Sequence, residues 1–141
     1  MSQQVPAPTE GAGAAADTPY AQLGGEAALH ALVERFYDLM DLEPAYAGIR
    51  ALHAPALDDA REKLFMFLSG WLGGPNLYIE RHGHPRLRGR HLPFAIGVAE
   101  RDQWLACMDQ AMGECAVPAG LRERLAQAFF QTADFMRNRP G

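Results

Sequence analysis

Apolar residues recur at helical spacing in four separate segments of this 141-residue chain. The segments cover residues 26–41, 57–71, 98–113 and 119–137, and each gathers its apolar side chains on one face at intervals of three and four residues. No convincing stretch alternates apolar and polar residues with the period of two that a half-buried strand requires. The pattern therefore predicts an all-α protein whose four main helices bury their apolar faces against one another.

Glycine and proline residues mark the ends of these predicted helices. Pro44 follows the first segment, and Gly73-Gly74-Pro75 follows the second, where a glycine supplies a left-handed cap and proline cannot continue the helix. Residues 1–18 are mainly Ala, Gly, Pro and Gln, so we expect a disordered tail there and one folded domain over residues 19–141. Residues 75–95 mix charge with proline and glycine, which predicts mostly irregular structure with one short helical turn around His91.

Composition and charge argue against several classes of protein. The net charge of −4 gives no general attraction to nucleic acid, and the sequence has no run of about 18 apolar residues to span a membrane. Cys107 and Cys115 would lie about 12 Å apart along a continuous helix, which is beyond the reach of a disulfide. Two free thiols, together with the lack of a secretory signal pattern, favour a cytoplasmic protein.

The segment GHPRLRGRHLPFAIG places His91 between basic and apolar residues. Three arginines precede this histidine and an apolar trio follows it, namely Arg86, Arg88, Arg90, Leu92, Pro93 and Phe94. Such a histidine suits haem, which needs an axial nitrogen, an apolar slot and cations for its two propionates. Two alternatives stay open: a core-edge histidine beside solvated arginines, and a zinc site that His91 would form with His82 and His84.

Two aromatic residues with hydrogen-bond donors lie on or beside the buried faces of separate predicted helices. They are Tyr37 in the first helix and Trp104 in the third. A hydroxyl or an indole N–H in an apolar setting needs an acceptor, and a diatomic ligand with negative charge on its outer atom is one such acceptor. The alternative is that both are ordinary core aromatics that donate to backbone carbonyls.

Four segments of the chain carry a family resemblance, and in order they read YAQLGGEAALHALVERFYDLM, REKLFMFLSGWLGGP, YIERHGHPRLRGRHLPFAIG and ERDQWLACM. Together they resemble the group II truncated haemoglobins, over essentially all of the chain after residue 18. The resemblance implies a truncated globin, a two-over-two α-helical sandwich around haem b. In that fold the proximal helix is shortened to a loop and one turn, which accounts for the long segment 75–95.

The resemblance also implies roles for individual residues. His91 stands at the proximal position, where it would bind the haem iron through one ring nitrogen while the other nitrogen donates to a backbone carbonyl. Tyr37 and Trp104 stand at the distal positions that hold the ligand. A third distal position aligns with His53 when one gap is allowed, and with Leu52 when none is.

Further residues are implied to surround the haem. Arg90 and Tyr78 are implied as propionate partners, whereas Arg86 and Arg88 are expected to be solvated. Ala60 occupies a position where many globins have a distal histidine, and a methyl group gives no hydrogen bond. The side chains expected to pack against the ring are Leu64, Phe67, Leu68, Phe94, Ile96 and Met108.

The implied function is a haem protein that binds O2, and also CO and NO, with the ligand held by the distal tyrosine and tryptophan. The alternative is an enzyme, either a nitric oxide dioxygenase or a peroxidase, that takes electrons from an external reductase. A helical interaction module without haem is a third hypothesis, because a sequence does not show a cofactor. We expect neither a nucleic-acid nor a membrane partner, and a monomer or a homodimer.

Overall fold

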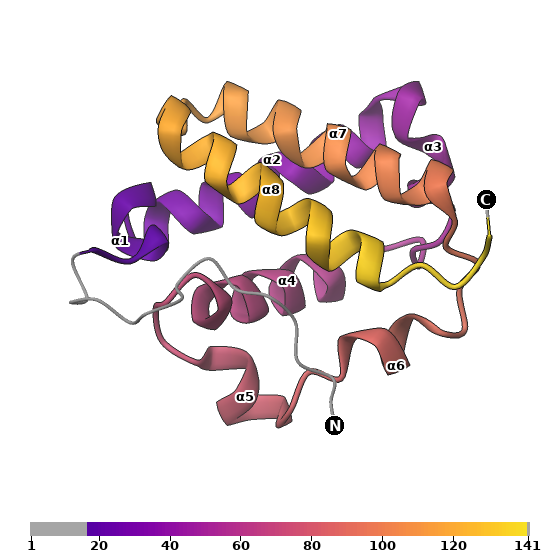
Figure 1. The fold of residues 1–141 in the computed structure, drawn as a ribbon, viewed down its shortest axis with the longest axis horizontal. Coiled ribbons are helices and arrows are strands. Elements are labelled where there is room, and N and C mark those ends of the chain that lie inside the picture. Colours follow the sequence, from indigo (N-terminus) through magenta and orange to yellow (C-terminus); the bar gives the residue numbers. More distant parts are fainter. Residues whose placement is uncertain (1–16, 141) are drawn as a thin grey trace.

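A computed structural model describes residues 17–140 of the chain (Figure 1). Four long helices correspond to the four predicted segments: α2 (Glu26–Leu42), α4 (Asp58–Trp71), α7 (Val98–Glu114) and α8 (Ala119–Phe135). Residues 17–140 contain no strand, and the predicted all-α fold class is confirmed. The predicted disordered tail falls mostly on residues 1–16, which lie outside the described residues, so the tail and its domain boundary stay predictions.

Shorter helical elements precede or connect the long helices within residues 17–140. They are α1 (Pro19–Leu23), the 3-10 turn η2 (Pro44–Tyr46), α3 (Ala47–Arg50), α5 (Leu77–His82) and α6 (Leu87–His91). The expectation of mostly irregular structure over residues 75–95 is therefore wrong in part, because α5 and α6 both lie there. Tyr78 is the one buried residue of α5 and α6 has none, so neither helix carries the repeated apolar face that periodicity detects.

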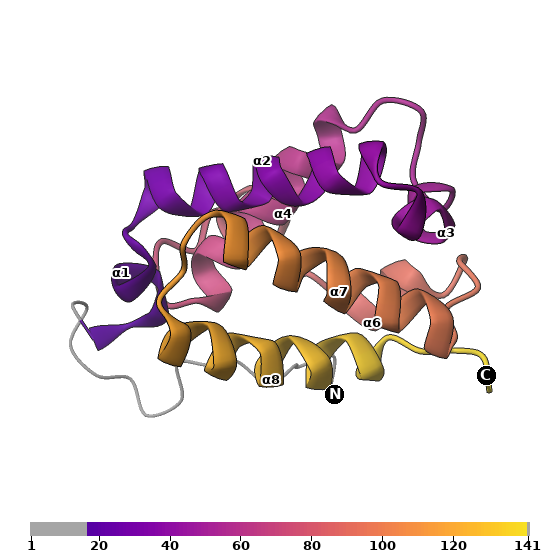
Figure 2. The ribbon, with the colours of Figure 1, turned by 90° about the horizontal axis from the view of Figure 1, so that it is seen from above.

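The long helices form two antiparallel pairs, α2 with α4 and α7 with α8 (Figures 1 and 2). Their shared core contains Phe36 and Met40 from α2, Met108 from α7 and Leu125 from α8, each at most 1% exposed. Burial of one such side chain contributes about 1.5–3 kcal/mol, so these contacts fix how the two pairs stack. The α5–α6 segment runs along one side of the stack (Figure 1).

The glycine pair after α4 ends that helix as the sequence predicts. Gly73 has a φ of 98°, which lies in the left-handed region. Its N–H donates to the carbonyl of Gly70 at 3.0 Å, and the N–H of Gly74 donates to the carbonyl of Ser69 at 2.8 Å. These two bonds form a Schellman cap, which satisfies carbonyls that the helix end leaves unpaired and turns the chain into α5.

Two further predictions can be compared with the structure. The thiols of Cys107 and Cys115 are free, and Cys107 is buried. None of the helices between residues 17 and 140 is long and apolar enough to cross a membrane.

Candidate functional site

A cavity of about 390 Å³ lies between α4, α6 and the α7–α8 pair. Apolar and aromatic side chains form most of its wall, as in sites that bind cofactors. The predicted site residues that line this central cavity are Tyr37, Leu52, His53, Ala60, Leu64, Phe67, Leu68, Tyr78, Arg90, His91, Phe94, Ile96 and Trp104. Met108 differs from them, because it is buried in the core and does not line the cavity.

A second hollow of about 600 Å³ is open to solvent between α2 and α4. Its wall consists largely of charged side chains that pair with one another, such as Arg61 with Glu34 at 2.7 Å and with Asp38 at 2.9 Å. Residues 17–140 bring no three His, Cys, Asp or Glu side chains together in a group able to hold a metal ion. The chemistry that the sequence predicts therefore belongs to the central cavity.

His91 is the last residue of α6, and its imidazole lines the central cavity. The Nδ1 atom lies 2.6 Å from the carbonyl oxygen of Leu87, one turn earlier in the same helix. A carbonyl oxygen only accepts hydrogen bonds, so in the neutral ring Nδ1 carries the proton and Nε2 keeps its lone pair. The expected hydrogen bond between one ring nitrogen and a backbone carbonyl is present, and it leaves Nε2 as the nitrogen able to bind a metal.

Tyr37 projects from α2 and is 5% exposed. Burial raises the pKa of its hydroxyl well above the usual value, although the Arg61 guanidinium, 5.8 Å from the ring centroid, opposes part of that rise. The hydroxyl is therefore protonated at neutral pH and able to donate. It makes no hydrogen bond to another side chain or carbonyl within residues 17–140. Since no fully buried side-chain polar atom in that range lacks a partner, the hydroxyl cannot be fully buried and must lie at the cavity surface.

His53 follows α3 and lies against Tyr37, with ring centroids 5.8 Å apart. Its Nδ1 lies 2.9 Å from the carbonyl oxygen of Ile49, which again places the proton on Nδ1. Burial lowers the pKa of His53, so the ring is neutral at neutral pH. Leu52 and His53 both line the cavity, and it is His53 whose ring contacts Tyr37.

Trp104 lies on α7 between two phenylalanines of neighbouring helices. Its ring centroid is 5.1 Å from that of Phe36 on α2 and 5.4 Å from that of Phe129 on α8. These contacts hold the indole at the cavity wall. Within residues 17–140 the indole N–H has no hydrogen-bond acceptor, so it is a second donor available to a ligand in the cavity.

Cationic side chains lie on the wall of the cavity. The Arg90 guanidinium lies 5.9 Å from the ring centroid of Tyr78, and its Nε donates to the carbonyl of Pro85 at 2.8 Å. Lys63 also lines the cavity and pairs with Asp59 at 3.1 Å. Sequence reasoning missed Lys63, although its place three residues after Ala60 on one predicted helix was a usable signal.

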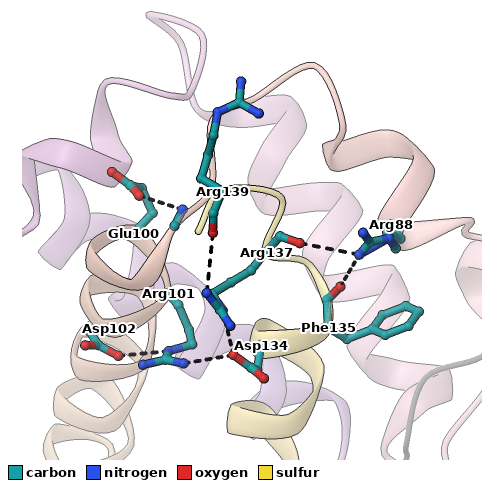
Figure 3. A network of polar contacts seen from close by, with 9 residues as sticks. Arg88, Glu100, Arg101, Asp102, Asp134, Phe135, Arg137 and Arg139 are labelled. Carbon is teal, nitrogen blue, oxygen red and sulfur yellow. Dashed lines mark hydrogen bonds and ion pairs between the residues drawn. The ribbon is translucent and has the colours of Figure 1, made fainter. Parts of the chain in front are cut away.

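Arg88 is not solvated as expected. It is half-buried and donates to the carbonyl of Phe135 at 2.9 Å and to that of Arg137 at 3.4 Å (Figure 3). Its partners are backbone carbonyls at the end of α8, far away along the sequence, and no local pattern indicates them. Arg86 is exposed, as expected, and immediately precedes α6 with a left-handed φ of 49°.

Two antiparallel helix pairs around an apolar cavity, with an oriented histidine at the end of α6, define the class of small helical globins. The bacterial-like globin family matches residues 18–138. The chain is 38% identical over 122 residues to the group 2 truncated hemoglobin YjbI of Bacillus subtilis (strain 168), which covers 86% of this chain and 89% of that protein.

Solved structures agree with this likeness. The cold-adapted truncated hemoglobin of the Antarctic marine bacterium Pseudoalteromonas haloplanktis TAC125 superposes with a TM-score of 0.84 and 46% identity, over 87% of this chain and 99% of that one. The group II 2-on-2 hemoglobin of the plant pathogen Agrobacterium tumefaciens gives a TM-score of 0.83 and 45% identity, over 86% of this chain and 94% of that one. The chain belongs to the group II truncated haemoglobins, within the bacterial-like globin family.

The comparisons confirm the predicted family and the two-over-two helical fold, and the haemoglobin relatives imply a haem cofactor and a gaseous ligand. The donor set of this chain fits that cofactor. The central cavity is mainly apolar, it contains the His91 imidazole with Nδ1 bonded to a backbone carbonyl and Nε2 without such a partner, and it has cations on its wall. These are the features that an apolar macrocycle with one axial nitrogen and two carboxylates requires.

Proposed function

We propose that the central cavity binds one haem b and that the chain holds a diatomic ligand, O2 above all, on the distal side. The observation that carries this proposal is the hydrogen bond from His91 Nδ1 to Leu87, because it directs Nδ1 to the backbone and leaves Nε2 as the nitrogen available to a metal beside an apolar cavity. A bound haem supplies a ferrous iron that takes O2, CO or NO. The residues of the chain then determine how firmly the cofactor and the ligand are held.

On the proximal side, His91 Nε2 would hold the haem iron. The Leu87 carbonyl accepts from Nδ1 and thereby fixes the ring tautomer and increases the electron density at Nε2. Phe94 and Ile96 would pack on this side of the macrocycle, and Leu64, Phe67 and Leu68 on the distal side. Arg90, Tyr78 and the newly identified Lys63 are the proposed partners of the propionates.

On the distal side, the Tyr37 hydroxyl and the Trp104 indole N–H are the proposed donors to the ligand. Each such hydrogen bond stabilises the bound ligand by about 1 kcal/mol or more. If the bond exists only in the bound state, a stabilisation of about 1.4 kcal/mol slows ligand release tenfold. The edge-to-face contact with His53 supports the Tyr37 ring, and its neutral imidazole adds no charge beside the ligand.

Two distal donors favour an enzymatic role over a simple carrier, because a ligand held by both leaves slowly. The proposed reactions are oxidation of nitric oxide to nitrate with bound O2, or turnover of peroxide, and electrons would come from a separate reductase. Nitric oxide consumption with a reductant, compared with the rate of O2 release, tests this alternative. Rapid O2 release without nitric oxide turnover would contradict it.

The cofactor proposal is tested by visible spectra of the ferric, the reduced and the CO-bound protein. The wild type should give a Soret band that shifts when CO is added to the reduced protein. In His91→Ala the spectrum should be disrupted and restored by added imidazole. His84→Ala is the matched control, because His84 is exposed and outside the cavity, and its spectra should equal those of the wild type. A wild type without a Soret band after haem reconstitution would refute the proposal.

A further inference from the structure

We propose that Asn138 is a positioning residue for His91, and that the segment after α8 acts through it to hold the proximal imidazole in place. This inference rests on the proposed function, in which His91 is the axial ligand. Asn138 does not line the central cavity, so its effect must pass through the backbone of the loop that joins α6 to α7.

Helix α6 needs contacts from other elements to hold its position. The helix is five residues long and contains no buried residue. Helices of this length are unstable in water unless other contacts support them. Because apolar burial within α6 is lacking, the contacts that fix His91 must be hydrogen bonds to other elements or packing against a ligand in the cavity.

The side chain of Asn138 forms hydrogen bonds with the segment that begins at His91. Its Nδ2 donates to the carbonyl of Phe94 at 2.8 Å and to the carbonyl of His91 at 3.2 Å. Its Oδ1 accepts from the N–H of Ile96 at 2.9 Å. The amide therefore uses both of its donor hydrogens and its acceptor oxygen on three residues of one loop.

The backbone of the same segment strengthens this attachment. The N–H groups of Asn138 and Arg139 donate to the carbonyl of Ile96 at 2.8 Å and 3.1 Å. The orientation of the Asn138 amide follows from its partners, since a backbone N–H can only donate and the two carbonyls can only accept. Five hydrogen bonds thus join residues 138–139 to the loop between His91 and Ile96.

A second tether reaches α6 from the same end of α8. Arg88, three residues before His91, donates to the carbonyls of Phe135 and Arg137, which the end of α8 leaves without helical partners (Figure 3). Asp134 in turn accepts from Arg101 of α7 and from Arg137, both at 2.8 Å (Figure 3). The segment that holds α6 is therefore fixed to α7, the helix that carries Trp104.

This arrangement has a consequence for the site. The α7–α8 pair holds both His91 and Trp104 in position. His91 depends on this pair because its own helix, α6, contains no buried residue. Loss of the Asn138 amide should leave the carbonyl of His91 with the N–H of Phe94 as its donor, at 3.0 Å, and should loosen the loop that follows. The imidazole would then sample several tilts relative to the haem plane, and the cofactor would be held less firmly.

The test compares Asn138→Ala with Asn138→Asp and with Arg139→Ala in the haem-loaded protein. Asn138→Asp keeps the size and the acceptor for Ile96 but loses both donors. Arg139→Ala is the matched control, because the Arg139 side chain donates to the Asn138 carbonyl alone and its backbone N–H is retained. Circular dichroism verifies that each variant keeps the helix content of the wild type.

Two haem readouts are expected to change in both Asn138 variants and to stay unchanged in Arg139→Ala. The iron–histidine stretching band of the reduced protein should shift or broaden in resonance Raman spectra. Haem should transfer to an excess of a second haem-binding protein about tenfold faster. In the cofactor-free protein, the Ile96 amide should exchange with deuterium about tenfold faster in Asn138→Ala, which loses its acceptor, than in the wild type.

Other outcomes have distinct meanings. Faster exchange at Ile96 with an unchanged iron–histidine band and unchanged haem transfer would overturn the positioning role, since Asn138 would then fasten a loop without affecting His91. If Asn138→Ala loses helix content, the positioning role is tested with the isosteric Asn138→Asp, by the iron–histidine band and the rate of haem transfer. A wild type that takes up no haem would refute the proposed function and the positioning role with it.

Discussion

The rings of Tyr37 and His53 meet edge to face, with their centroids 5.8 Å apart and their planes at 80°. His53 can hold this position because its Nδ1 donates to the Ile49 carbonyl and its surroundings keep the ring uncharged. A protonated imidazolium would have to be buried beside the Arg50 guanidinium, which also disfavours the charged form. The contact therefore belongs to the neutral state of His53.

The first prediction concerns the pH dependence of folding stability. Burial lowers the pKa of His53, so below about pH 6.5 the unfolded chain binds a proton that the folded chain does not. This contribution to stability is present above the unfolded pKa and is lost as the pH falls through the lowered folded value. Urea unfolding at pH 7.5 and 5.5 should give a larger loss for the wild type than for His53→Phe. Equal losses would show that His53 titrates as it does in water.

The second prediction concerns the aromatic core below the cavity. Phe129 is 3% exposed and contacts both Trp71 and Trp104, with ring centroids at 5.1 Å and 5.4 Å. Phe129→Ala should lower the free energy of unfolding by about 3–5 kcal/mol, because it removes these contacts and leaves a cavity. Urea unfolding measures the change.

Phe130 offers a matched control for that substitution. It is the next residue of α8, it is 44% exposed, and its main contact is the Arg101 guanidinium at 5.0 Å. Phe130→Ala should change the free energy of unfolding by no more than about 1 kcal/mol. Similar losses for the two alanine variants would contradict the orientation of α8 described above.

The third prediction concerns the glycine cap of α4. An alanine at Gly73 would have to adopt its left-handed φ of 98°, which should cost about 1–2 kcal/mol. Gly120 lies in the first turn of α8 and a Cβ there would meet no atom within 4 Å, so Gly120→Ala should stabilise the fold by up to about 1 kcal/mol. Thermal or urea unfolding of both variants should give changes of opposite sign, and a stabilising Gly73→Ala would exclude the cap.

The long helices are predictable from the sequence because each buries a stripe of apolar residues. Phe36 and Leu125, for example, lie on faces that repeat over several turns and are at most 1% exposed. The short helices α5 and α6 are not predictable in this way, since Tyr78 is the one buried side chain between them. Their ends depend on glycine conformation and on contacts with distant residues.

The same limit applies to the site. His91, Tyr37 and Trp104 stand out in the sequence because each places a nitrogen or oxygen among apolar neighbours, and the family resemblance then assigns their roles. All three line one cavity. Arg88 and Asn138 cannot be chosen from the sequence, because they bind backbone groups far away in the chain. The partners of Arg88 are 47 and 49 residues away, and those of Asn138 are 42 to 47 residues away. A polar residue that binds distant backbone leaves no periodic pattern in the chain.

The last prediction concerns ligand release, which tests the two distal donors directly. Tyr37→Phe and Trp104→Phe each remove one donor to the ligand and should each speed O2 release about tenfold. Because both donors would contact one ligand, the effect of the double variant on the release rate should differ from the product of the two single effects.

Tyr46→Phe is the control for these substitutions. The Tyr46 hydroxyl donates to Gln110 at 2.6 Å, outside the cavity, so the substitution should reduce stability by about 1 kcal/mol and leave O2 release unchanged. Stopped-flow mixing of the O2-bound protein with excess CO measures the rates. A release rate in Tyr37→Phe equal to that of the wild type would remove Tyr37 from the distal site, and Trp104 would then have to hold the ligand alone.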